Sequence, residues 1–228
     1  MKSIVFDTGP VISLATNSLL WVLGKLKERY PGKFLIPIQV KNELIEKPIA
    51  TKRYKLEALQ VNREINRGTL TVVDDARIDK LKVELMELAN NCFSARGVPM
   101  RIVQDGEMGA LAAAIVYNAD AVVIDERTTR ELIESPQHLV DVMSKNLQTK
   151  VSINHKTLQE LQSKVKHLRV IRSIELAVVA YELGWFDQYL TQDKDARKTL
   201  IEAVLWGIKI RGASISQREI DKIVKLEK

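Results

Sequence analysis

The sequence predicts an α/β fold in which helices cover a central parallel sheet. Short apolar runs, such as those at 3–7 and 121–125, have the length and composition of buried strands. Longer segments with apolar residues at helical spacing separate these runs. Because strands that alternate with helices are joined by crossover connections, this order predicts a parallel sheet with helices on its faces.

The first 130 residues contain most of the predicted strands, separated by helical segments. We expect strands at 3–7, 34–36, 69–73 and 121–125. We expect helices at 11–26, from Pro37 through IQVKNELI, at 49–67, at 76–92 and at 106–117. Asp105 is the expected N-cap of the last of these helices, since a short acidic side chain accepts hydrogen bonds from the first amides of a helix. Gly97-Val98-Pro99 is expected to be a loop.

Beyond Arg130 the pattern becomes mostly helical, which divides the chain into three parts. We expect a core at 1–130, a helical insertion at 131–167, and a last strand with C-terminal helices at 168–228 that complete the domain. The last strand is expected at 168–171, and the helices at 175–186, 196–210 and 217–226. Ser216 followed by Glu219 has the spacing of a capping box, which supports a helix start there.

Composition is that of a globular protein with a modest basic excess. The 228 residues are 46% hydrophobic and 28% charged, and the net charge is +6. This excess is compatible with a phosphate-rich partner. The single cysteine, Cys92, excludes an intrachain disulfide and a cysteine-rich zinc site. The apolar run at the N-terminus contains an aspartate, unlike a signal peptide, and no run is long enough to span a membrane. We therefore expect a cytoplasmic protein.

Two of the predicted strands end on an acid, Asp7 and Asp125. In open α/β sheets, sites form beyond the carboxyl ends of the strands, so these side chains converge if the strands are neighbours. Two helices would add Glu43 and Glu107. Carboxylates crowded in one crevice repel each other, and a hard divalent cation such as Mg²⁺ or Mn²⁺ relieves that repulsion. Such an ion also activates water and neutralises charge on a phosphate.

The four acids stand in motifs that resemble those of PIN-domain ribonucleases. The matching segments are FDTGPVISLA with Asp7 and Thr8, VKNEL with Glu43, DGEMGALAAA with Glu107, and VVIDERTTR with Asp125. The DGE form and the C-terminal VLWGIKIRGASIS are similar to an archaeal and bacterial, VapC-like branch. The resemblance covers residues 1–130, with a weaker match at 168–216. Ile124 and Glu126 depart from it, because many relatives have Thr and Asp there.

This resemblance implies a fold, an activity and partners. The fold would be a three-layer α/β/α PIN-like fold with a helical insertion and C-terminal helices. The activity would be hydrolysis of phosphodiester bonds in RNA by an Mg²⁺- or Mn²⁺-dependent endoribonuclease. The catalytic and metal-binding residues would be Asp7, Glu43, Glu107 and Asp125. Many small PIN proteins are toxins held by an antitoxin protein, and homodimers are common in the family, whereas other members process ribosomal RNA.

Simpler explanations stand beside each of these assignments. Turn amides could satisfy Asp7 and Asp125 without any ligand, and Asp105 competes with Glu107 for the third acidic position. Thr8 would orient an acid or a water, or serve only the turn. Arg127 and Arg130 would contact the phosphate, or be ordinary surface arginines. A phosphatase with an aspartate nucleophile needs a second aspartate where Gly9 stands. A PIN fold without activity, acting as an RNA- or protein-binding module, is the remaining alternative.

Overall fold

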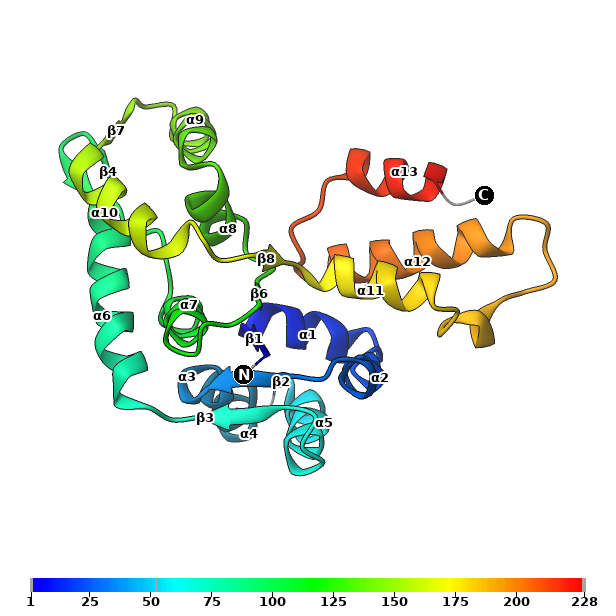
Figure 1. Cartoon of the computed structure of the whole chain (residues 1–228). Coiled ribbons are helices and arrows are strands. Elements are labelled where there is room, and N and C mark those ends of the chain that lie inside the picture. Colours follow the sequence, from blue (N-terminus) through cyan, green and yellow to red (C-terminus); the bar gives the residue numbers. More distant parts are fainter. Residues whose placement is uncertain (1, 52, 227–228) are drawn as a thin grey trace.

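The central feature of the computed structural model, which describes residues 2–51 and 53–226, is a parallel sheet between helices (Figure 1). Its strands lie in the order β3-β2-β1-β6-β8, and every neighbouring pair is parallel. The strands are β1 Ser3–Phe6, β2 Lys33–Pro37, β3 Thr71–Val73, β6 Ala121–Val123 and β8 Val170–Ile171. The predicted fold class is therefore confirmed.

Each central strand buries both of its faces. Val5 packs in one hydrophobic core and Phe6 in the other, and the pairs Leu35–Ile36 and Val122–Val123 alternate in the same way. Successive side chains of a strand point to opposite faces, so two consecutive apolar residues require a helical layer on each side. This explains why the strands are continuous apolar runs in the sequence.

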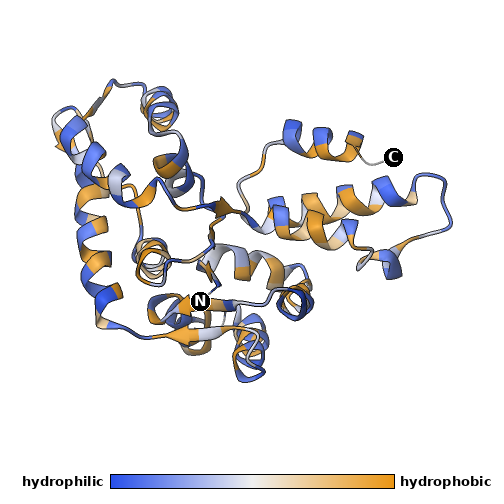
Figure 2. Ribbon diagram, viewed as in Figure 1, coloured by the Kyte–Doolittle hydropathy of each residue, from blue (hydrophilic) through white to orange (hydrophobic). Residues whose placement is uncertain are grey.

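Helices from the two ends of the chain cover the Phe6 face, and helices from its middle cover the Val5 face. On the Phe6 side lie α1 Thr8–Thr16, α2 Trp21–Arg29, α5 Lys55–Asn66, α11 Ser173–Glu182, α12 Ala196–Ile210 and α13 Gln217–Leu226. On the Val5 side lie α6 Ala76–Asn91, α7 Asp105–Val116, α8 Arg127–Glu134, α9 Pro136–Leu147 and α10 His155–Val165. In Figure 2, hydrophobic residues are concentrated on the central strands and along α12.

A continuous helical segment follows β2 and contains a π-helical turn. It consists of α3 Ile38–Lys41, the π turn η1 Asn42–Glu46 and α4 Lys47–Ala50. Pro37 ends β2 and occupies the N-cap position of this segment, one position earlier than predicted. π turns inside helices are rare and occur frequently at functional sites.

Two predicted helices are wrong in extent because the chain turns where the apolar spacing continues. The helix predicted at 11–26 is divided into α1 and α2, and Ser18 between them has a φ of 58°. The helix predicted at 49–67 begins only at Lys55, after Tyr54 with a φ of 59°. A residue with left-handed backbone cannot continue a right-handed helix. The spacing of apolar residues does not indicate where such a residue lies.

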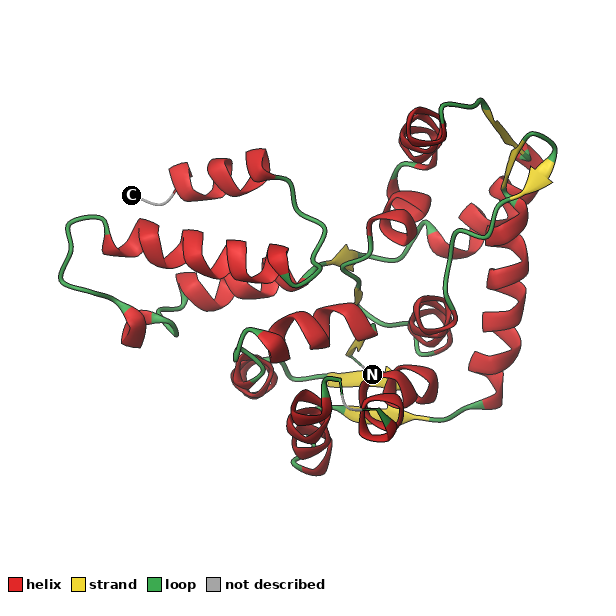
Figure 3. Cartoon of the chain, turned by 180° about the vertical axis from the view of Figure 1, so that it is seen from behind, coloured by secondary structure: helices red, strands yellow, loops and turns green. Residues whose placement is uncertain are grey.

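A second, antiparallel sheet corrects two further predictions. It has the order β5-β4-β7, with β4 Phe93–Ala95, β5 Val98–Pro99 and β7 Val151–Ile153. Arg96 and Gly97 both have positive φ, as a two-residue hairpin turn requires, so the predicted loop at 97–99 is a hairpin. The insertion predicted as helical contributes β7. Figure 3 shows these strands well apart from the central ones.

In the C-terminal part, helices α12 and α13 have the predicted bounds. The helix predicted at 175–186 is α11 at 173–182, and the strand predicted at 168–171 covers only 170–171. A short 3-10 turn, η2 Asp187–Tyr189, lies between α11 and α12. Ser216 and Glu219 exchange the hydrogen bonds of a capping box, at 3.2 and 2.8 Å.

Within the described residues, the structure contains no helix whose length and apolar character would allow it to cross a membrane. The division at 130 and 167 stays a prediction.

Candidate active site

The carboxyl ends of β1 and β6 meet at a cavity of about 250 Å³. The two strands are adjacent, with Phe6 paired to Val123, and the amide of Asp7 donates to the carbonyl of Val123 at 3.0 Å. Asp7 and Asp125 therefore leave neighbouring strands at the same edge of the sheet. The cavity is lined by Asp7, Thr8, Gly9, Glu43, Gln104, Glu107, Asp125, Glu126 and Gly212. The structure thus brings together the four predicted acids.

Asp7 is buried at the start of α1. Its side chain is 4% exposed and caps the helix, accepting a hydrogen bond from the amide of Gly9 at 3.3 Å. Burial raises the pKa of Asp7 to about 7, and the charges of Glu107 and Glu43 add to the effect, while backbone amides at Thr8 and Gly9 oppose it. Turn amides alone therefore do not compensate for burying this carboxylate.

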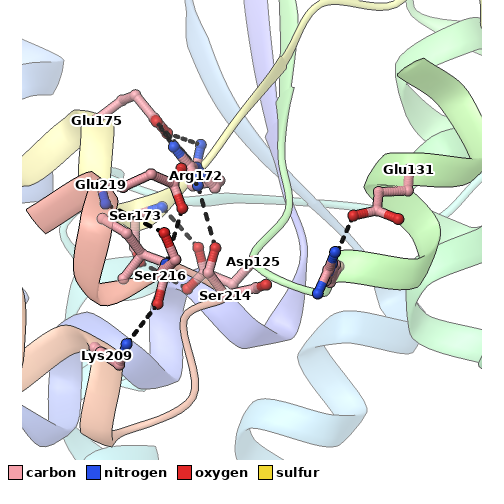
Figure 4. A network of polar contacts seen from close by, with 11 residues as sticks. Asp125, Glu131, Arg172, Ser173, Glu175, Lys209, Ser214, Ser216 and Glu219 are labelled. Carbon is pink, nitrogen blue, oxygen red and sulfur yellow. Dashed lines mark hydrogen bonds and ion pairs between the residues drawn. The ribbon is translucent and has the colours of Figure 1, made fainter. Parts of the chain in front are cut away.

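Asp125 is held from the neighbouring strand end by Ser173. The backbone amide of Ser173 donates to Oδ1 at 2.8 Å, and its hydroxyl donates to Oδ2 at 2.7 Å (Figure 4). Asp125 is 2% exposed, and burial raises its pKa while the bonds from Ser173 lower it. A Cβ built at Gly9 would lie 3.5 Å from the Cβ of Asp125, so α1 and Asp125 are in close contact.

Glu107 lies in the first turn of α7 and is 7% exposed. Its Oε2 accepts hydrogen bonds from the hydroxyl of Thr129 at 2.5 Å and from the amide of Gln104 at 3.3 Å. Burial raises the pKa of Glu107, and these bonds lower it. The predicted N-cap was wrong: Gln104 caps α7, and Asp105 turns outward to an ion pair with Lys82 at 2.8 Å. Glu107 lines the cavity and Asp105 does not. The assignment of Glu107 as the third acid of the site stays a prediction.

Glu43 reaches the cavity from the π turn and is the most exposed of the four acids. Its Oε2 accepts a hydrogen bond from the Thr8 hydroxyl at 2.7 Å, and Nζ of Lys47 lies 3.9 Å from Oε1. A Cβ at Gly106 would stand 2.6 Å from Oε2. The absence of a side chain at Gly106 is therefore what lets the Glu43 carboxylate lie against the start of α7.

A family model described as a PIN domain matches residues 3–137, more than half of the chain. The chain belongs to the PIN-domain family. Among solved structures, it is similar to VapBC2 from Rickettsia felis, solved bound to a DNA fragment from its promoter. The identity is 15%, the match covers 75% of this chain and 98% of that one, and the TM-score is 0.43. No curated protein matches the chain.

The two arginines predicted beside the site of this PIN domain lie outside the lining of its cavity. Arg127 is exposed, and its Nε donates to Oε1 of Glu131 at 2.5 Å. Arg130 is half-buried, and its Nε is buried without a hydrogen-bond partner among the described residues. Contact of either residue with phosphate stays a prediction. Thr8, in contrast, lines the cavity and positions Glu43.

Several residues of the cavity were not predicted from the sequence. Ser173 and Thr129 hold two of the acids, although they lie 48 and 22 residues away from them in the chain. Glu126 lines the cavity, and its Oε2 caps α8 through the amide of Thr129 at 2.8 Å. The one sequence signal for Ser173 is its place two residues after the last strand, at the start of the following helix.

The carboxylates fit a hard divalent cation in chemistry and in place. Three of them are more than nine-tenths buried around one small cavity, and burial raises the pKa of each. Oxygen ligands of this kind suit Mg²⁺ or Mn²⁺. Among residues 2–51 and 53–226, no three His, Cys, Asp or Glu side chains are already gathered as a metal-binding group.

Proposed function

We propose that this PIN domain is an Mg²⁺- or Mn²⁺-dependent endoribonuclease. The observation that supports the proposal is the convergence of four carboxylates, three of them buried, at the carboxyl ends of two adjacent strands. Buried, mutually repelling carboxylates cost stability unless a cation or protons neutralise them. A divalent cation bound by these carboxylates would supply the charge neutralisation and the activated water that phosphodiester hydrolysis requires.

The size of the cavity favours a backbone phosphate over a small metabolite. Its volume of about 250 Å³ lies below the ~300–1,000 Å³ of pockets that enclose whole small molecules. A phosphodiester group with an ion and a few waters fits, while the bases would remain outside. RNA as the substrate follows from the family resemblance, and so does a toxin role with an antitoxin partner or a second copy of the chain.

Some residues of the site would bind the metal ion, and their burial would exclude solvent from it. A bound Mg²⁺ or Mn²⁺ would neutralise the phosphate and lower the pKa of an attacking water. Asp7, Glu43, Glu107 and Asp125 would hold the ion. The burial of Asp7, Glu107 and Asp125 keeps bulk water from competing. Thr8 would keep Glu43 turned towards the cavity. No covalent intermediate is required.

An RNA cleavage assay with Mn²⁺, Mg²⁺ or EDTA tests the proposal. Wild-type chain should cleave single-stranded RNA with either ion and not with EDTA. Asp7→Asn and Asp125→Asn remove one charge each at nearly constant volume, so cleavage should fall by at least about a hundredfold while the fold survives. Glu46→Gln is the matched control. Oε1 of Glu46 forms an ion pair with Nζ of Lys41 at 2.9 Å, and Glu46 does not line the cavity.

Two results would contradict the proposal. Cleavage that persists per folded molecule in Asp7→Asn, together with a lower melting temperature, would make these acids structural. Absence of cleavage by wild-type chain with every divalent ion and a panel of RNAs would favour the binding module without activity. A melting curve on the same samples is therefore needed beside each rate.

A further inference from the structure

We infer that Arg172 is a positioning residue that couples the C-terminal segment 212–219 to the carboxylate of Asp125. The inference rests on the proposed function, because it assigns Asp125 to the metal site. It concerns a part of the chain beyond residues 3–137, which match the PIN family model. Figure 4 shows the residues concerned.

Two segments that follow Asp125 far along the sequence contact it, in addition to the side chain of Ser13 in α1. From β8 and α11, Ser173 donates to both carboxylate oxygens. From the C-terminal segment, the amide of Ser214 donates to the backbone carbonyl of Asp125 at 3.3 Å. Gly212 of the same segment lines the cavity. The C-terminal segment therefore forms part of the wall of the site.

Arg172 joins these two segments. Its side chain is 12% exposed, and Nη1 donates to the carbonyl of Ser214 and to Oε1 of Glu219, each at 3.1 Å. Its Nε donates to Oε1 of Glu175 at 2.9 Å, and Nη2 donates to the same oxygen. A planar guanidinium satisfies two carboxylates and a carbonyl at fixed angles, which a lysine ammonium does not reproduce.

The geometry makes Arg172 more than a link between helices. Arg172 precedes Ser173, so the backbone that aims Ser173 at Asp125 is the backbone that Arg172 anchors. Arg172 also donates to the carbonyl of Ser214. The amide of the same residue donates to the backbone carbonyl of Asp125. Loss of either contact would loosen a segment that contacts Asp125, through Ser173 on the carboxylate or through Ser214 on the backbone carbonyl. Groups that orient metal ligands commonly change metal affinity by ~10–100-fold when removed.

The test compares two variants with a matched control. Arg172→Lys keeps the positive charge but loses the planar guanidinium and its several N–H donors. Glu219→Gln removes the negative charge that pairs with Arg172, and a glutamine at this position can still form the capping box. Glu219 is 44% exposed, so this variant should fold even if Arg172→Lys does not. Arg169→Lys is the control, because Arg169 is exposed and precedes β8 by one residue.

Two readouts on the full chain distinguish positioning from a structural role. We expect Mn²⁺ binding, measured by calorimetry, to weaken about tenfold in Arg172→Lys and less in Glu219→Gln. We expect hydrogen exchange to quicken in the peptides containing Ser173 and Asp125 as well as in 212–219. The double variant should be non-additive, because both changes remove one contact.

A lower melting temperature and faster exchange confined to α13, with Mn²⁺ affinity unchanged, would overturn the inference. If wild-type chain binds neither Mn²⁺ nor Mg²⁺, the proposed function fails. Hydrogen exchange at Ser173 and Asp125 then still decides whether Arg172 positions them, since that readout needs no metal.

Discussion

The Glu43 carboxylate lies directly against Gly106, where an added Cβ would stand 2.6 Å from Oε2. Gly106 is the second residue of α7, and Glu107 beside it lines the same cavity. A bare backbone at this position lets an acid from the π turn approach an acid from α7. The glycine of the DGE motif therefore shapes the site without contributing a functional group.

Gly106→Ala should disturb the site and leave the fold intact. The new methyl group would displace the end of the flexible Glu43 side chain, which moves more easily than backbone. Alanine in place of glycine stabilises a helix by up to about 1 kcal/mol, so the melting temperature should hold or rise. Mn²⁺ affinity, measured by calorimetry, should fall by about tenfold.

Gly109→Ala is the matched control, because its Cβ would lie 3.3 Å from Oε1 of Gln39, which does not line the cavity. This variant should gain the same helix propensity and keep its Mn²⁺ affinity. Equal affinities in the two variants would show that Glu43 is not a metal ligand.

Ser173→Ala tests how Asp125 is held. The substitution removes the hydroxyl that donates to Oδ2 and leaves a 2%-exposed carboxylate with one partner fewer. Unfolding should become easier by roughly 1–3 kcal/mol, and Mn²⁺ affinity should fall by about tenfold. Ser163→Ala, on an exposed position of α10, should change neither. A fall in stability with unchanged affinity would restrict Ser173 to a structural role.

The sequence predicts the strand ends well because their pattern is local. A buried strand that ends on an acid shows itself as an apolar run followed by Asp, as at Asp7 and Asp125. The parallel order then places both acids at one edge of the sheet. Helices α12 and α13 were likewise predicted to the residue, since their apolar spacing and the capping box at Ser216 are local signals.

Features that depend on distant pairing were missed. β4 pairs with β7 across more than fifty residues, and neither short strand has a distinctive composition. Ser173 contacts Asp125 over a separation of 48 residues, so no local sequence pattern predicts this contact. Gln104 rather than Asp105 is the N-cap residue of α7, and Asp105 instead pairs with Lys82 from α6. In each case a tertiary contact decides between locally equivalent alternatives.

Metal binding should release protons at mildly acidic pH. The pKa of Asp7 is raised to about 7 by burial, with repulsion from Glu107 and Glu43 adding to it, and burial also raises the pKa of Glu107 and of Asp125. A cation requires the ionised form, so binding at pH 6 should expel about one proton from Asp7, and nearly none at pH 8. Calorimetry in two buffers of different ionisation enthalpy counts the protons. No release at pH 6 would contradict a buried, protonated Asp7.

The stability of Asp7→Asn relative to wild type should increase with pH in metal-free buffer. Below pH 3.8, Asp7 is protonated in both the folded and the unfolded chain and does not affect stability. Between pH 3.8 and about 7 the unfolded chain loses the proton while the folded chain retains it. The free energy of unfolding of wild type therefore falls over this window, by up to about 4 kcal/mol for this raised pKa at 1.36 kcal/mol per unit.

Asparagine has no such titration, and it still caps α1 by accepting a hydrogen bond from the amide of Gly9. Groups with lowered pKa, such as Asp75 and Glu219, titrate in the opposite direction but are the same in both chains. The difference between the chains therefore reports Asp7 together with its repulsion from Glu107 and Glu43. In melting curves from pH 4 to pH 8, the melting temperature of Asp7→Asn should rise relative to that of wild type. Saturating Mn²⁺ should stabilise wild type alone and close the gap. A pH-independent difference would show that Asp7 is ionised in the folded chain.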